Sequence, residues 1–260
     1  QLAGIESPTA HGLLADIYSY AGEIEATIDF LNRSSFLQSH PELTSLLARA
    51  HLVNDEAETA KALIAARLVD FPESIELLLA KGEVAIFDGD ATLATSVFES
   101  ILKIDQENDL AWYGLGRIYS EREFVSEALD SLTTAIEINP MGAGYLGEKA
   151  VVETFANQYR AAEASFEQSL SQQAADAVAL TGKGVLLLKQ GKLEDAIQQF
   201  LKAGLLEPDL ARVQVFLAIA YYQQGNADLA LETLDLAKEI DDKDPLPYFL
   251  ESTIRKERFQ

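Results

Sequence analysis

The chain has 260 residues, of which 42 are acidic and 20 are basic, so its formal net charge is −22 at pH 7. A field of this sign argues against nucleic acid and anionic membranes as partners, because phosphate groups are bound by Lys and Arg. The absence of cysteine excludes thiol nucleophiles, disulfides and zinc sites with cysteine ligands. No apolar run reaches the roughly 18 residues that a transmembrane helix needs.

One residue type recurs at a fixed spacing along the chain. Seven alanines follow one another at intervals of 34 residues, and each is followed four residues later by Phe, Ile or Leu. A period of this length is typical of solenoids, in which each small unit buries its apolar face only against its neighbours. The alanines are Ala26, Ala60, Ala94, Ala128, Ala162, Ala196 and Ala230.

Each period predicts two helices joined by a turn. The first helix carries apolar or small residues at i, i+3, i+4 and i+7. A small residue near its centre, such as Gly184, lets the second helix approach, with the repeating alanine against it. Gly191 marks a turn inside a pair, and Asn139-Pro140 marks one between pairs. In chain order the predicted pairs occupy residues 7–40, 41–74, 75–108, 109–142, 143–176, 177–210 and 211–244, and a final helix occupies 245–260.

The fourth pair carries a recognisable pattern at eight positions: Trp112, Leu115, Gly116, Tyr119, Ala128, Leu132, Ala135 and Pro140. It resembles the tetratricopeptide repeat (TPR), a 34-residue helix–turn–helix. The resemblance implies an all-α, right-handed superhelical solenoid, with seven repeats and a final helix in one array over residues 1–260. Gln1 at the start and a loose likeness of residues 234–247 to bacterial envelope TPR proteins indicate a fragment of a longer bacterial protein.

The resemblance also implies a binding groove. In TPR arrays the first helices line the concave side, and positions 2, 5, 9, 12 and 13 of each repeat face a bound peptide or partner helix. From the fourth repeat onward several of these positions are apolar or aromatic, and aromatic side chains supply much binding energy when a partner covers them. The predicted partner-binding residues are Tyr113, Arg117, Gly144, Gly147, Val151, Phe155, Val185, Leu188, Val215, Ile219, Tyr222 and Phe249.

Two of these residues are glycines in the first helix predicted for the fifth repeat. Gly costs up to about 1 kcal/mol in a helix relative to Ala, so Gly144 and Gly147 indicate either close packing or room for a ligand, and we favour room. The apolar strip itself has an alternative explanation. The repeats, or the final helix folding back, would bury it within the chain.

The sequence shows no arrangement of catalytic residues. Its three histidines, His11, His40 and His51, lack the spacing of a metal site. The G-x-G-x-x-G run at residues 142–147 follows a predicted helix, whereas a dinucleotide-binding loop follows a strand. We therefore expect a non-enzymatic protein without a cofactor or metal.

Two functions remain open. The first is a scaffold that binds a protein or peptide in the groove. The 23 acidic and 8 basic residues of 1–130 give −15, which suits a basic partner, although such charge more often serves solubility. The second is a structural or self-associating arm of a larger bacterial envelope or secretion-related protein, in which Phe249 and Ile254 of the final helix form a homodimer. The sequence leaves cytoplasm and periplasm open.

Overall fold

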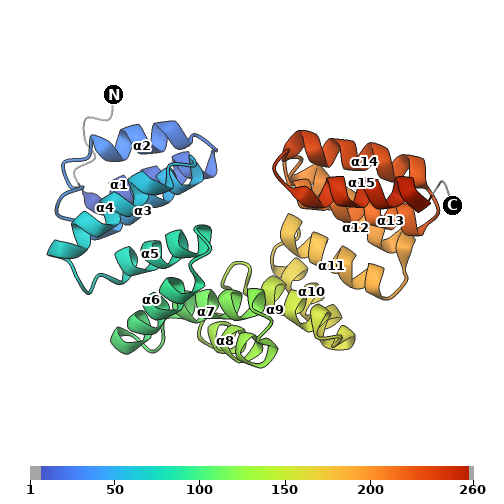
Figure 1. Cartoon of the computed structure of the whole chain (residues 1–260). Coiled ribbons are helices and arrows are strands. Elements are labelled where there is room, and N and C mark those ends of the chain that lie inside the picture. The colour runs from blue at the N-terminus through green and yellow to red at the C-terminus, as the bar shows by residue number, and fades with distance from the viewer. Residues whose placement is uncertain (1–6, 258–260) are drawn as a thin grey trace. The chain divides into compact units, whose positions relative to one another are not determined.

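The computed structural model describes residues 7–257, except for the side chain of Tyr20. These residues form fifteen α-helices and no strand (Figure 1). The helices are α1 (Pro8–Tyr20), α2 (Ile24–Asn32), α3 (Pro41–Val53), α4 (Ala57–Asp70), α5 (Ile75–Phe87), α6 (Ala91–Ile104), α7 (Asp109–Glu121), α8 (Val125–Ile138), α9 (Tyr145–Phe155), α10 (Tyr159–Gln172), α11 (Ala177–Lys189), α12 (Leu193–Leu206), α13 (Ala211–Gln223), α14 (Ala227–Ile240) and α15 (Pro245–Glu257). The predicted all-α solenoid of helix pairs is confirmed.

The helices start at a regular interval. From α4 to α14 every even-numbered helix begins 34 residues after the previous one, at 57, 91, 125, 159, 193 and 227. The odd-numbered helices α3, α5, α7, α11, α13 and α15 begin at 41, 75, 109, 177, 211 and 245, while α9 begins at Tyr145. The residue before α9 is Gly144, which has a φ of 81°, so it precedes the helix instead of lying within it.

From α3 onward, the turn inside each pair contains one residue in left-handed conformation, and these residues are again 34 apart. The next N–H then donates to a carbonyl five residues back, as from Lys192 to Leu187 over 2.9 Å, which closes the end of the first helix. Glycine adopts this conformation without strain. It stands at three of the six positions, and the other three are Asp55, Glu123 and Asn157.

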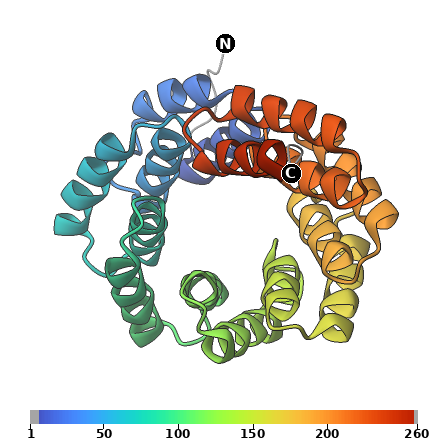
Figure 2. The same cartoon turned by 45° about the vertical axis from the view of Figure 1, so that its right-hand side comes forward.

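Close contacts divide the chain into two compact units, Gln1–Phe124 (unit 1) and Val125–Gln260 (unit 2). Within each unit the odd-numbered helices contact one another in order, α1–α3–α5–α7 and α9–α11–α13–α15. Among residues 7–257, the even-numbered helices of a unit make no such contacts with one another. The odd-numbered helices therefore form the inner layer of each unit, and the even-numbered helices form the outer layer (Figure 2).

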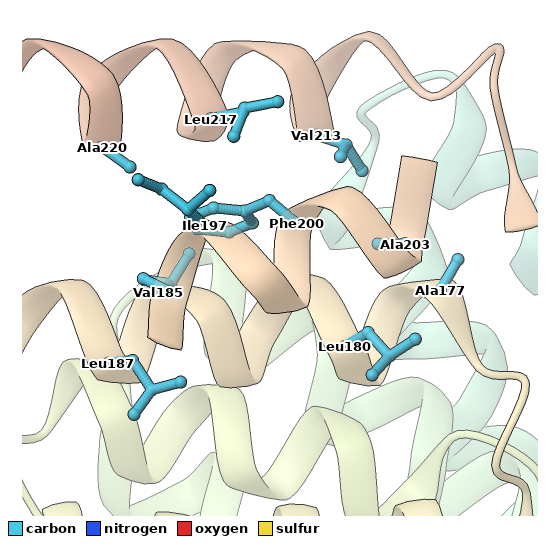
Figure 3. Packing of buried hydrophobic residues seen from close by; sticks show 11 residues of the cluster. Ala177, Leu180, Val185, Leu187, Ile197, Phe200, Ala203, Val213, Leu217 and Ala220 are labelled. Carbon is cyan, nitrogen blue, oxygen red and sulfur yellow. The ribbon is translucent and has the colours of Figure 1, made fainter. Parts of the chain in front are cut away.

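Phenylalanine rings of the outer layer fill spaces left by glycines of the inner layer. Phe200 of α12 is fully buried and lies between α11 and α13 (Figure 3). A Cβ atom at Gly184 of α11 would lie 2.4 Å from this ring. The Phe98 ring fills the space over Gly82 and Gly114 in the same way, at 2.6 and 2.5 Å. From the sequence we expected the repeating alanine at this contact, but the phenylalanine ring four residues later lies nearest to the position of the added Cβ atom.

Candidate protein-binding pocket

The inner layer of unit 2 contains a cavity of about 670 Å³. Its walls come from three successive odd-numbered helices, α9, α11 and α13, from the two loops that precede α13 and α15, and from the last residue of α14. Volumes of this size are typical of ligand-binding pockets. The lining residues are Val151, Thr154, Phe155, Val178, Thr181, Gly182, Val185, Asp209, Leu210, Ala211, Arg212, Phe216, Ile240, Asp241 and Asp244.

Two aromatic residues stack where the pocket meets the core. Phe216 of α13 stacks on Phe200, with ring centroids 5.9 Å apart and planes inclined by 13°. Phe216 occupies the repeat position at which α7 and α11 carry Gly114 and Gly182. In α7 and α11 the glycine at this position faces the phenylalanine ring of the preceding outer helix. The Phe216 side chain of α13 therefore packs against Phe200, and it also lines the pocket.

Two apolar side chains of the pocket wall are exposed. Phe155 at the end of α9 is 59% exposed, and Val178 at the start of α11 is 57% exposed. The ammonium of Lys189 lies 5.1 Å from the centre of the Phe155 ring. Lys189 occupies the position in the next repeat that is equivalent to Phe155. A partner that covers these side chains gains the free energy of removing apolar surface from water.

The pocket carries more negative than positive charge. Asp209, Asp241 and Asp244 line it together with Arg212, which makes no ion pair among the residues that the structure describes. One oxygen of Asp241 and one of Asp244 accept backbone N–H groups, over 3.0 and 2.9 Å. These bonds fix the orientation of both carboxylates.

The structure places the predicted partner-binding residues of unit 2 in different surroundings. Val151, Phe155 and Val185 line the pocket. Leu188, Ile219 and Tyr222 are half-buried on the same helices, and Phe249 of α15 is 68% exposed. Val215 is only 1% exposed, so it packs inside unit 2 and offers no surface to a partner. The remaining residues are Gly144, Gly147 and, in unit 1, Tyr113 and Arg117.

The glycines of the fifth repeat do not leave room for a ligand. A Cβ atom at Gly147 would make ordinary contacts with Ser169 Oγ at 3.6 Å and with the Cβ of Ala179 at 3.7 Å, and Gly147 is buried. Gly144 serves the turn through its positive φ. The backbone conformation therefore explains Gly144, whereas the surroundings of Gly147 would accommodate an alanine. Because Gly147 is buried, it forms no notch open to a ligand, and our preference for one was wrong.

The inner layer of unit 1 is more polar. Arg49 of α3 and Glu83 of α5, which are 34 residues apart, form a bidentate ion pair over 2.7 and 2.9 Å. In α7 the Arg117 guanidinium lies 5.9 Å from the centre of the Tyr113 ring. The equivalents of Arg49 in α9, α11 and α13 are apolar: Val151, Val185 and Ile219. The apolar groove face is therefore a feature of unit 2.

The last described helix, α15, packs against the rest of unit 2 through apolar and charged residues. Ile254 of α15 is 4% exposed within a core cluster, so it is not available for the homodimer contact that the sequence suggested. Lys238 of α14 pairs with Glu251 over 2.9 Å, and Arg255 pairs with the same carboxylate over 2.8 Å. Both cations, Lys238 first, hold the pKa of Glu251 below its usual range.

Tyr222 is tied to this same helix. Its hydroxyl donates a hydrogen bond to Glu257 of α15, and this bond raises the pKa of the phenol. Tyr222 therefore helps to hold α15 in place, whereas the sequence assigned it only to partner binding.

The histidines have structural contacts. His51 is 8% exposed, and its Nδ1 lies 2.5 Å from a carboxylate oxygen of Glu56, whose pKa is lowered by this contact. His11 lies 2.8 Å from Ser34 Oγ. Within residues 7–257 no cluster of three or more His, Asp or Glu could hold a metal ion. No described helix combines the length and apolar character that crossing a membrane requires.

Comparisons with protein families agree with the repeat. Residues 10–155 match the family ChAPs (Chs5p-Arf1p-binding proteins), more than half of the chain. Residues 148–209 and 198–245 match the tetratricopeptide repeat family. The chain belongs to the TPR proteins and, through residues 10–155, to the ChAPs family. No curated protein sequence matches this TPR chain significantly.

Solved TPR structures share the fold. One is from the APC/C hetero-tetramer Cut9–Hcn1, with 17% identity and a TM-score of 0.81, covering 99% of this chain and 51% of that one. The chain thus spans about half the length of that protein. A TPR protein of Parabacteroides merdae has 15% identity and a TM-score of 0.72, covering 94% and 97% of the two chains. TTC0263 of Thermus thermophilus has 21% identity and a TM-score of 0.62, covering 68% and 96%.

The sequence-based site residues include only Val151, Phe155 and Val185 of the pocket lining, and they miss Val178, Arg212 and Phe216 among others. Val178 and Arg212 occupy groove position 2 of their repeats, so a complete reading of that position would have found them. The signal for Phe216 is that a large ring replaces the glycine of other repeats. The loop aspartates had no sequence signal, because their approach to the pocket depends on how successive pairs stack.

Proposed function

We propose that this protein is a non-enzymatic scaffold, and that unit 2 binds a segment of a partner protein in the pocket between α9, α11 and α13. TPR folds generally mediate protein–protein interaction. The observation that carries the proposal is the combination of an inner-layer cavity with the exposed side chains of Phe155 and Val178 at its wall.

The energy available from this surface is sufficient for specific binding. A phenylalanine buries on the order of 200 Å², and Phe155 is 59% exposed, so a partner can remove about 100 Å² of its surface from water. At about 25 cal/mol per Å² this contributes about 2.5 kcal/mol. Substitution of Phe155 by Ala should therefore weaken binding by about 2 kcal/mol, or about thirtyfold in Kd.

A display library of random peptides tests the proposal without knowledge of the natural partner. The wild-type chain and the variants Phe155→Ala, Val178→Asp and Leu205→Ala would each be used to select peptides. Leu205 is the matched control, because it is 83% exposed on α12 and does not line the pocket. We expect peptides that bind wild type and Leu205→Ala but bind both pocket variants at least tenfold more weakly.

Recovery of peptides that bind all four proteins equally would contradict the pocket assignment.

The alternative of a self-associating arm makes a different prediction. In that case light scattering would show a molar mass that falls on dilution, and Phe155→Ala would shift this equilibrium.

A further inference from the structure

The charges of the pocket lie at its loop side. Asp209 belongs to the loop before α13, Asp241 and Asp244 belong to the loop before α15, and Arg212 lies in the first turn of α13. Three carboxylates and one guanidinium give this side a formal charge of −2. Asp209, Asp241 and Arg212 are exposed, and Asp244 is half-buried.

Most of the apolar residues of the same cavity come from its helices. Phe155, Val178 and Phe216 belong to α9, α11 and α13, while Leu210 and Ile240 lie beside Asp209 and Asp241. A ligand that fills the cavity therefore meets both apolar surface and carboxylates. Because Asp241 and Asp244 are already oriented by backbone N–H groups, their remaining oxygens can accept hydrogen bonds from a cation with little further ordering.

From this arrangement we infer the chemistry of the occupant, given the proposed function of the pocket. It is a protein segment that places a bulky apolar side chain against Phe155, Val178 and Phe216, and a Lys or Arg beside the three aspartates. An acidic segment meets like charge at the pocket and a chain of net charge −22. A purely apolar segment desolvates the carboxylates without pairing them, which opposes binding.

The expected charge preference is moderate. An exposed ion pair changes binding by a few fold, so three carboxylates together give a preference of about tenfold at low salt. The Debye length falls from about 10 Å at 0.1 M salt to about 3 Å at 1 M. The preference should therefore shrink on addition of salt, while the apolar contribution remains.

The experiment uses the library peptides whose binding depends on Phe155. Each one that contains Lys or Arg is synthesised in two versions, one with its basic residues and one in which every basic residue is replaced by Gln. Fluorescence anisotropy gives their Kd for the whole chain. The test variant is Asp209→Asn/Asp241→Asn/Asp244→Asn, in which the amide oxygens at positions 241 and 244 can still accept the backbone N–H groups. The matched control is Glu167→Gln/Asp195→Asn/Glu232→Gln. It alters the net charge by the same amount, but at exposed helix positions outside the pocket.

We expect the basic peptides to bind wild type and the matched control about tenfold more tightly than their Gln versions, and to lose this advantage on the test variant. An equal loss on the matched control would show that the overall field is responsible and would overturn the inference. Phe155-dependent peptides without a basic excess would overturn it while leaving the proposed function intact. Failure to recover any Phe155-dependent peptide would overturn both.

Discussion

Substitution of Gly184 by Ala tests how the inner and outer layers of unit 2 fit together. Helix propensity alone favours Ala over Gly by up to about 1 kcal/mol. The new Cβ atom, however, would lie 2.4 Å from the nearest atom of the Phe200 ring. That ring is fully buried and stacks on Phe216, so it has little space into which it can move.

Overpacking of this kind costs about 1–3 kcal/mol. After subtraction of the gain in helix propensity, Gly184→Ala should lower the free energy of unfolding by up to about 2 kcal/mol. Gly204 of α12 is the matched control. A Cβ atom there would lie 3.6 Å from both Gln214 and Val213, which is ordinary contact. Gly204→Ala should therefore raise the free energy of unfolding by up to about 1 kcal/mol.

Urea denaturation followed by circular dichroism measures the two variants against wild type. Because long repeat arrays do not always unfold in one step, hydrogen exchange of the amides in α11–α13 would localise the change. A Gly184→Ala protein as stable as Gly204→Ala would refute the reasoning. If it is destabilised as expected, Phe200→Leu should cost less in the Gly184→Ala background than in wild type, because the smaller side chain relieves the contact.

Two further predictions concern ion pairs of unit 2. The Glu153 side chain is 4% exposed and pairs with Lys149 over 2.6 Å. In urea denaturation Lys149→Met should therefore lower the free energy of unfolding by about 3 kcal/mol, and adding Glu153→Leu should restore most of the loss. A double variant no more stable than the single variant would contradict this. The pKa of Glu251 is lowered by Lys238 and Arg255. These ion pairs contribute about 1 kcal/mol to the stability of the folded chain. The contribution is present above the unfolded pKa of Glu251, near 4.5, and is lost as pH falls through the lower pKa of the folded state. Thermal unfolding between about pH 6 and pH 3 should show a steeper loss of stability for wild type than for Glu251→Gln; identical slopes would argue against the pair.

The sequence predicted the helix-pair fold because a solenoid repeats one local packing problem. The seven alanines and the residues four positions later fix which face of each helix is buried, and this face depends only on neighbours in the same and adjacent pairs. The prediction of one array over residues 1–260 is a separate matter and remains a prediction. It concerns how units 1 and 2 continue into each other, which local periodicity does not address.

The candidate site was less accessible to sequence reasoning. Position counting identified Val151, Phe155 and Val185 as pocket residues, but it also placed Val215 on the surface and gave Gly147 the wrong explanation. Both errors have one cause. Whether a residue on an inner helix faces solvent or the next helix depends on the separation of the two helices, and that separation is set by which side chains lie between them.

The sequence by itself determined the helices, their order and the apolar character of the inner face in unit 2, because these follow from residue spacing within one period. Only the tertiary structure decided that Phe216 stacks on Phe200, that Ile254 is buried, and that aspartates from two loops line one cavity. These features depend on contacts between residues that are close in space only after successive pairs have stacked, and no periodicity along the chain encodes the distance between them.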